Sequence, residues 1–211
     1  MYKVNASLQA LPHDIGRARA FPPGWLENES IWLHMEYKYL LEVLEAGLYD
    51  EFFEDLKTAL VPFLDPETYG RSTLENSSFL VSSAHADPLL HGSGFVARLS
   101  GSTAEALTMW TVVMAGKQPF SVQGGRLCLV LQPLLPGWLF TKEGDLSFRF
   151  LGSCTVTYKN PDRVDTWRTS PKRAVLHLAG GKNVELSGTV IEMPYAEQVR
   201  EGGVTAIDVW F

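Results

Sequence analysis

The chain has few cysteines and no long hydrophobic run. Only Cys128 and Cys154 occur among its 211 residues, and both lie in alternating apolar segments. Two such cysteines are typical of buried free thiols in a reducing compartment, not of a disulfide framework. No stretch reaches the ~18 consecutive apolar residues of a membrane span, and the amino-terminal residues contain no signal-peptide core. We therefore expect a cytoplasmic protein.

The sequence also lacks a basic run. Its formal net charge is −6, from 18 lysines and arginines against 24 aspartates and glutamates. Proteins that bind nucleic acid or an anionic membrane surface concentrate positive charge. We therefore expect neither as a partner. The hydrophobic fraction of 45% is sufficient for a globular core.

The amino-terminal half carries the three- and four-residue spacing of helices. Apolar residues at this spacing predict a helix from about Asn28 to Gly47, a residue typical of helix C-caps. A second helix follows after a very short link, so we expect an antiparallel hairpin. A loop is predicted over 64–76, and a short buried segment over 79–81.

A third helix is predicted over 103–115, with Ser102 and Glu105 at the spacing of a capping box. The start of a helix gathers unpaired backbone N–H groups and partial positive charge, which suits an anion such as phosphate. Simple capping is the alternative for these residues. The three helices carry more apolar surface than one hairpin can cover. We therefore expect them to pack on the following domain or on further helices.

After Gly116 the apolar spacing changes to two. Short strands without intervening helices are expected, separated by turn signals such as Gly124-Gly125 and Asn160-Pro161. This order predicts an antiparallel β-sandwich. The fold class is therefore α+β, with a helical region over 1–116 and a sandwich domain over 117–211. The predicted strands are 127–131, 146–150, 155–158, 174–178, 184–186, 189–193 and 205–210.

Several short motifs follow one another in a specific order. They are Glu27-Asn28, Ile31-Trp32-Leu33-His34, Leu99-Ser100-Gly101-Ser102, Leu134-Leu135-Pro136-Gly137-Trp138, Phe148-Arg149-Phe150-Leu151-Gly152 and Val156-Thr157-Tyr158-Lys159-Asn160-Pro161. In this order they resemble the carboxy-terminal part of glycoside hydrolase family 94, the cellobiose and chitobiose phosphorylases formerly placed in glycosyltransferase family 36. The resemblance covers the chain from about Phe21 onward. It implies hairpins of a six-hairpin α/α barrel, as in six-hairpin glycosidases, followed by a jelly-roll-like sandwich.

In that family inorganic phosphate attacks the anomeric carbon of a β-linked sugar with inversion, while one carboxylic acid protonates the leaving oxygen. The resemblance implies a phosphate site at His34, Ser100, Gly101 and Ser102, with Ser100 replacing the usual threonine. Phosphate is then a substrate, and no cofactor or metal is implied. The family's general acid lies upstream of the matched residues. We therefore assign no catalytic residue and expect no phosphorolysis from this chain alone.

The resemblance also implies sugar binding at Glu27-Asn28, where Leu26 replaces a sugar-binding lysine of the family. Carbohydrate sites combine carboxylate and amide groups with aromatic side chains, so Trp25, Trp32 and Glu75 are further candidates. Helix capping by the Glu-Asn pairs and core packing of the tryptophans are the alternatives.

Other interpretations of function and of single motifs stay open. The chain is alternatively a non-catalytic carbohydrate-binding or structural module, or a subunit completed by another chain. A homo-oligomer would also cover apolar helices. Oligosaccharide and phosphate are the expected partners of the complete enzyme. The cluster over 82–87 is predicted to be a hydrogen-bonded loop, not a hydrolase triad, and His85, Asp87 and His91 lack the spacing of a metal site.

Overall fold

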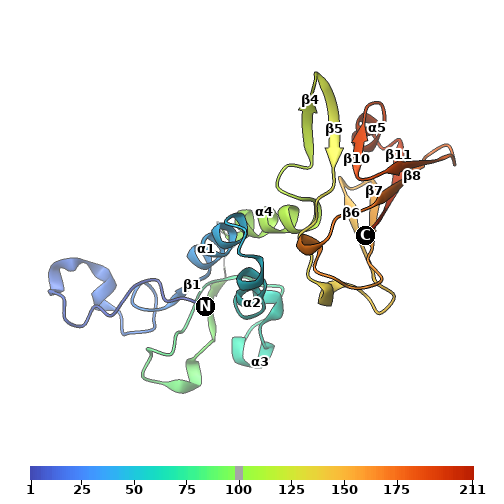
Figure 1. Cartoon of the computed structure of the whole chain (residues 1–211). Coiled ribbons are helices and arrows are strands. Elements are labelled where there is room, and N and C mark those ends of the chain that lie inside the picture. Colours follow the sequence, from blue (N-terminus) through green and yellow to red (C-terminus); the bar gives the residue numbers. More distant parts are fainter. Residues whose placement is uncertain (98–101) are drawn as a thin grey trace. The chain divides into compact units, whose positions relative to one another are not determined.

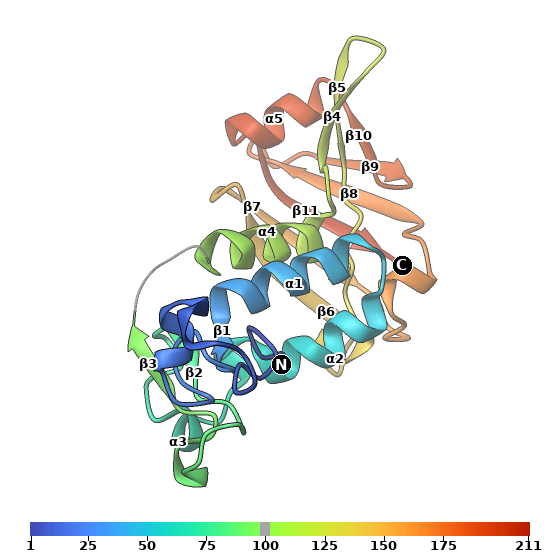
Figure 2. The same cartoon turned by 90° about the vertical axis from the view of Figure 1, so that its left-hand side faces the viewer.

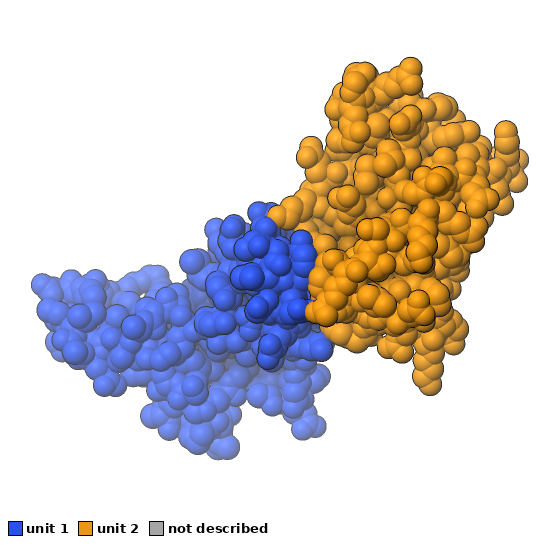
Figure 3. All heavy atoms as spheres, viewed as in Figure 1, with its two compact units in different colours: residues 1–109 blue, residues 110–211 orange. Residues whose placement is uncertain are grey.

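The computed structural model describes residues 1–97 and 102–211. Two compact units divide the chain, Met1–Met109 and Trp110–Phe211 (Figure 3). Over the described ranges the fold is a mixed α+β fold, with five α-helices and three small sheets. None of the helices in these ranges is long and apolar enough to cross a membrane.

The first unit contains the predicted helical hairpin (Figures 1 and 2). Its helices α1 (Leu33–Glu45) and α2 (Tyr49–Ala59) pack against each other. Gly47, with φ +82°, ends α1 in a Schellman motif, because its N–H donates to the Leu44 carbonyl and the next N–H donates to the Val43 carbonyl. The role predicted for Gly47 is confirmed.

A three-stranded antiparallel sheet also belongs to the first unit, and the sequence did not indicate it. It pairs β1 (Ile31–Trp32), β2 (Ser77–Leu80) and β3 (Gly94–Ala97) in that order. The helix predicted from Asn28 therefore begins only at Leu33, because the two residues before it pair with Leu80 and Phe79. The predicted buried segment around Phe79 is confirmed as part of β2.

The segment predicted as a loop over 64–76 contains a short helix, α3 (Pro66–Tyr69). Asp65 caps it by accepting a hydrogen bond from the Glu67 N–H at 3.0 Å, and Gly70 closes it in the left-handed region. Among the described residues, the 3-10 helices are η1 (His13–Ile15), η2 (Arg17–Ala20), η3 (Val61–Phe63), η4 (Pro88–Leu90), η5 (Gly137–Leu139) and η6 (Thr166–Arg168). The loop prediction is therefore wrong for these four residues, although the Asp65 cap and Gly70 are local sequence signals of a short helix.

The second unit contains two sheets, and every predicted strand is present with its ends shifted by at most one residue. The three-stranded sheet has the order β10-β5-β4, and the five-stranded sheet has the order β6-β7-β11-β8-β9. The strands are β4 (Phe120–Gln123), β5 (Arg126–Val130), β6 (Asp145–Phe150), β7 (Cys154–Lys159), β8 (Arg173–Leu178), β9 (Asn183–Ser187), β10 (Val190–Glu192) and β11 (Val204–Trp210).

Two features of this unit correct the expectation of an antiparallel fold without helices. β11 runs parallel to β7, although it is antiparallel to β8. A helix, α5 (Tyr195–Glu201), lies between β10 and β11 and ends at Gly202 with φ +81°. Seven residues are too few to show a clear helical period, which explains why α5 was missed.

The boundary between the units falls inside α4 (Ser102–Ala115), before the boundary at 116 that the sequence suggested. The last turn of this helix belongs with the second unit, whose groups satisfy its carbonyls. The Val113 carbonyl accepts the Leu134 N–H at 2.8 Å, and the Met114 carbonyl accepts the Tyr158 hydroxyl at 2.6 Å. Because the last carbonyls of a helix have no partner within the helix, these bonds fix the end of α4 to the second unit.

Candidate functional site

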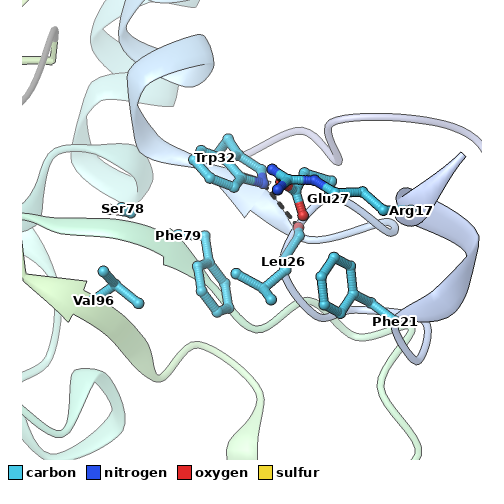
Figure 4. Close-up of a pocket in the computed structure, with 8 residues that line it drawn as sticks. All are labelled: Arg17, Phe21, Leu26, Glu27, Trp32, Ser78, Phe79 and Val96. Atoms are coloured by element: carbon cyan, nitrogen blue, oxygen red, sulfur yellow. Dashed lines mark hydrogen bonds and ion pairs between the residues drawn. The ribbon is translucent and has the colours of Figure 1, made fainter.

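A cavity of about 340 Å³ lies in the first unit beside Trp32 (Figure 4). This volume lies at the lower end of the range of small-molecule sites. The cavity combines an apolar wall with a few polar groups, the usual composition of such sites. The residues that line it are Arg17, Phe21, Leu26, Glu27, Trp32, Ser78, Phe79 and Val96.

The aromatic wall of the cavity comes from neighbouring strands. Trp32 of β1 and Phe79 of β2 are paired in the sheet, and their rings stack with centroids 6.1 Å apart. The indole N–H of Trp32 donates to the Leu26 carbonyl at 2.8 Å. This bond fixes the orientation of the half-buried Trp32 ring at the cavity.

The polar groups of the cavity centre on Glu27. One carboxylate oxygen of Glu27 pairs with the guanidinium of Arg17, which extends from η2 (Figure 4). The other oxygen, Oε2, is buried and has no hydrogen-bond partner among the described residues. A buried carboxylate oxygen without a donor is costly, so it would favour a ligand that brings a hydroxyl or N–H group.

Unusual backbone conformations surround the cavity. Leu26 and Val96, which line it, have φ values of +46° and +57°, and neighbouring Glu29 has +59°. The left-handed region is unfavourable for non-glycine residues and most of all for a β-branched one. Such strained positions concentrate at functional sites.

The loop that carries Glu27 is held by the amino-terminal segment. Asn5 donates to the Glu27 carbonyl at 2.9 Å and accepts the Glu29 N–H at 2.7 Å. The ammonium of Lys3 bonds to the buried Glu29 carboxylate at 2.7 Å. These three bonds span the strained part of the loop, so they hold Glu27 at the cavity.

The other sugar-site candidates do not line this cavity. Trp25 packs on Phe95 with ring centroids 4.6 Å apart. The buried Asn28 donates to the Phe21 carbonyl at 2.7 Å. Both side chains therefore support the loop. The Glu75 side chain is 53% exposed and pairs with Arg71.

A second polar cluster lies where α1 and α4 begin. His34 is the second residue of α1, and its Nε2 is 4.0 Å from the Glu105 carboxylate in the first turn of α4. The buried Ser102 hydroxyl accepts a hydrogen bond from the Asn76 amide. The structure thus brings two predicted phosphate-site residues, His34 and Ser102, to adjacent helix starts. The other two predicted residues, at positions 100 and 101, lie outside the described residues.

The cluster over 82–87 is the hydrogen-bonded loop that was predicted. The His85 ring accepts the Asp87 N–H at 3.1 Å, and Asp87 caps η4 by accepting the Leu89 N–H at 3.0 Å. The His91 ring hydrogen-bonds the His85 carbonyl at 2.9 Å. Across the described ranges no group of three or more metal-ligating side chains comes together.

Sequence reasoning missed Arg17, Ser78 and Val96, which line the cavity. They come from η2, β2 and β3, and only the pairing of distant strands brings them to Trp32. The alternation around Phe79 and Phe95, two aromatics in short segments between turn residues, is a signal that could have indicated the β2–β3 pair.

Comparisons with known proteins add no family to this description. No model of a protein family matches the chain, and no curated protein matches it. The resemblance to glycoside hydrolase family 94 therefore stays a prediction that rests on the motifs of the sequence.

Proposed function

We propose that the first unit binds carbohydrate in the cavity beside Trp32, as a non-catalytic part of a glycoside phosphorylase-like protein. The observation that carries the proposal is the buried Glu27 oxygen, which has no hydrogen-bond partner in the described ranges and lies beside a fixed tryptophan ring. A sugar presents both surfaces that this arrangement suits. Its C–H face packs on an aromatic ring, and its hydroxyl groups donate to a carboxylate.

The remaining polar groups complement these two contacts. Arg17 carries N–H donors, and Ser78 carries a hydroxyl that both donates and accepts. A cavity of about 340 Å³ has room for a single sugar ring more readily than for a long oligosaccharide. We therefore propose one neutral sugar unit of a β-linked oligosaccharide as the occupant.

The family architecture is part of the same proposal. The α1–α2 hairpin is the kind of element that an α/α barrel repeats, and we propose that the two sheets of the second unit stand in place of the family's sandwich, with the parallel β7–β11 pair as a departure from it. Further hairpins from another chain, or a second copy of this one, would complete such a barrel. These features support the proposal because the helical hairpin comes before the two sheets of the second unit along the chain, which is the order of elements in that family.

The test is a titration of the isotope-labelled chain with cellobiose, followed through the indole N–H signal of Trp32. We expect a saturable shift, and the Glu27→Gln variant is expected to bind at least about tenfold more weakly because it loses a charge-assisted hydrogen bond. Glu75→Gln is the matched control. Glu75 also precedes an asparagine and also pairs with an arginine, but it does not line the cavity.

Two outcomes would contradict the proposal. The Trp32 signal could stay fixed up to tens of millimolar cellobiose, which would exclude even weak binding. Alternatively, Glu75→Gln could weaken binding as much as Glu27→Gln does. The sugar would then bind elsewhere, or the effect would come from net charge alone.

A further inference from the structure

We propose that the second unit binds a small aromatic anion, such as an aromatic carboxylate, in an apolar cavity formed by the end of α4, the start of β4 and the end of β6. The cavity has a volume of about 290 Å³, close to the lower end of the range of small-molecule sites. It lies wholly within the second unit and shares no lining residue with the cavity beside Trp32. The proposal therefore goes beyond the proposed sugar site and does not depend on it.

One wall of this cavity is a cluster of aromatic rings. Phe120 of β4 stacks on Phe150 of β6 with ring centroids 6.0 Å apart, and Phe148 lies edge-on to Phe150 at 6.3 Å. Phe148 also contacts the ring of Tyr158, which is fully buried and hydrogen-bonded to the end of α4. These contacts hold the rings in place, so the wall is a preformed surface on which a flat aromatic ligand can pack.

Two further apolar side chains at the cavity stay in contact with water. Trp110 is 58% exposed and Leu151 is 53% exposed, and both line the cavity. Leu151 also has a φ of +51°, and Gly152 after it has +73°. Asn-Gly is the usual sequence where two successive residues take positive φ, because the left-handed region is unfavourable for a residue such as leucine. An exposed leucine in a strained position is explained if its side chain covers an apolar ligand.

Positive charge borders the same cavity. Among the described residues that line it, Arg149 is the only charged one. The guanidinium carbon of Arg200, on α5, lies 5.9 Å from the centroid of the Phe120 ring. Arg149 donates to the Thr155 hydroxyl at 3.2 Å, and within the described part of the chain neither arginine forms an ion pair with a carboxylate. Although the whole chain has a formal net charge of −6, an anionic group on the ligand would meet two cations here.

The test compares two probes that share one ring system, naphthoate and the neutral naphthalenemethanol. The isotope-labelled full chain is titrated at pH 7 and followed by NMR through the indole N–H signal of Trp110. We expect a saturable shift with naphthoate, and binding of naphthalenemethanol that is at least about threefold weaker because it lacks the charge. The Trp32 signal reports the sugar cavity separately, so failure of the sugar proposal would leave this result readable.

Two variants separate the charge from the apolar contact. Arg200→Gln is expected to remove most of the difference between the two probes, whereas Lys182→Gln is expected to keep it. Lys182 is exposed and directly precedes β9, the edge strand opposite β6, so it controls for the same change in net charge. Leu151→Asn is expected to unfold at or above the wild-type temperature, because asparagine tolerates positive φ, and to bind naphthoate at least about threefold more weakly.

Several results would overturn the proposal. A Trp110 signal that stays fixed up to about 10 mM naphthoate would exclude even weak binding. Equal binding of both probes, or an equal effect of Lys182→Gln and Arg200→Gln, would remove the role of the arginines. Leu151→Asn that binds as tightly as wild type would show that the leucine does not cover the ligand. A Trp110 signal that shifts with protein concentration alone would show that a second copy of the chain occupies the cavity instead.

Discussion

Removing the hydroxyl of Tyr158 is expected to destabilise the second unit. Tyr158 is fully buried on β7, and its hydroxyl donates to the Met114 carbonyl at 2.6 Å. Burial raises the pKa of this hydroxyl well above its ordinary value, so it keeps its proton at all ordinary pH values. Tyr158→Phe retains the ring, which packs near Phe148 and Phe211, and removes only the donor.

The expected loss in the free energy of unfolding is about 1–3 kcal/mol, the cost of leaving a buried polar group without its partner. The second unit is about the size for which 1 kcal/mol shifts the Tm by roughly 4–8 °C, so a fall in Tm of that order or more is expected. Hydrogen exchange gives a local measurement. The Leu134 N–H, which bonds to the Val113 carbonyl in the same turn of α4, should exchange faster in the variant.

The matched control is Tyr195→Phe, because Tyr195 is half-buried on α5 in the same unit. That substitution is expected to change stability by no more than about 0.5 kcal/mol. Equal unfolding of wild type and Tyr158→Phe, with unchanged exchange at Leu134, would refute the reasoning. The end of α4 would then be held by other contacts.

Two further predictions concern buried titratable groups. The Glu36 carboxylate accepts the Tyr2 N–H at 3.0 Å, and burial raises the pKa of Glu36 above its ordinary 4.5. The folded state therefore holds the proton more tightly than the unfolded state does. The stability that Glu36 contributes is full below pH 4.5 and is lost as pH rises through the raised pKa. Unfolding measured against pH should show this decline in wild type and less of it in Glu36→Gln; parallel profiles would contradict it. Burial raises the pKa of Cys154 to about 11, and Cys128 is also buried, so a thiol reagent at pH 8 should label both only after denaturation. Rapid labelling of the folded chain would show that they are accessible.

Local patterns predicted most of the elements, and long-range pairing decided the rest. Gly47 ends α1 as predicted because a Schellman motif depends only on residues close in sequence. The predicted start of α1 was wrong because Ile31 and Trp32 pair with β2, a strand more than 40 residues later in the sequence. Such long-range pairing overrides a local helical pattern. The parallel β7–β11 pair was missed for the same reason.

The candidate site shows the same division. Glu27 was found because its motif is local, and Trp32 was named as a possible stacking residue. Nothing in the sequence indicates that Val96 takes a positive φ, since β-branched residues avoid it. Glu105 was predicted as part of a helix cap. Its contact with His34 was not predicted, because it depends on the starts of α1 and α4 lying next to each other. Single positions were therefore predictable, but their neighbours across the fold were not.

The position of β11 has a consequence for the order in which the second unit is assembled. β6–β7 and β8–β9 are hairpins that close locally, but β11 lies between β7 and β8 in the finished sheet. On the ribosome, the β7 edge of one hairpin and the β8 edge of the other must therefore stay unpaired until residues 204–210 have emerged. An open strand edge can pair with another chain, so the nascent protein is most exposed to aggregation just before its central strand arrives.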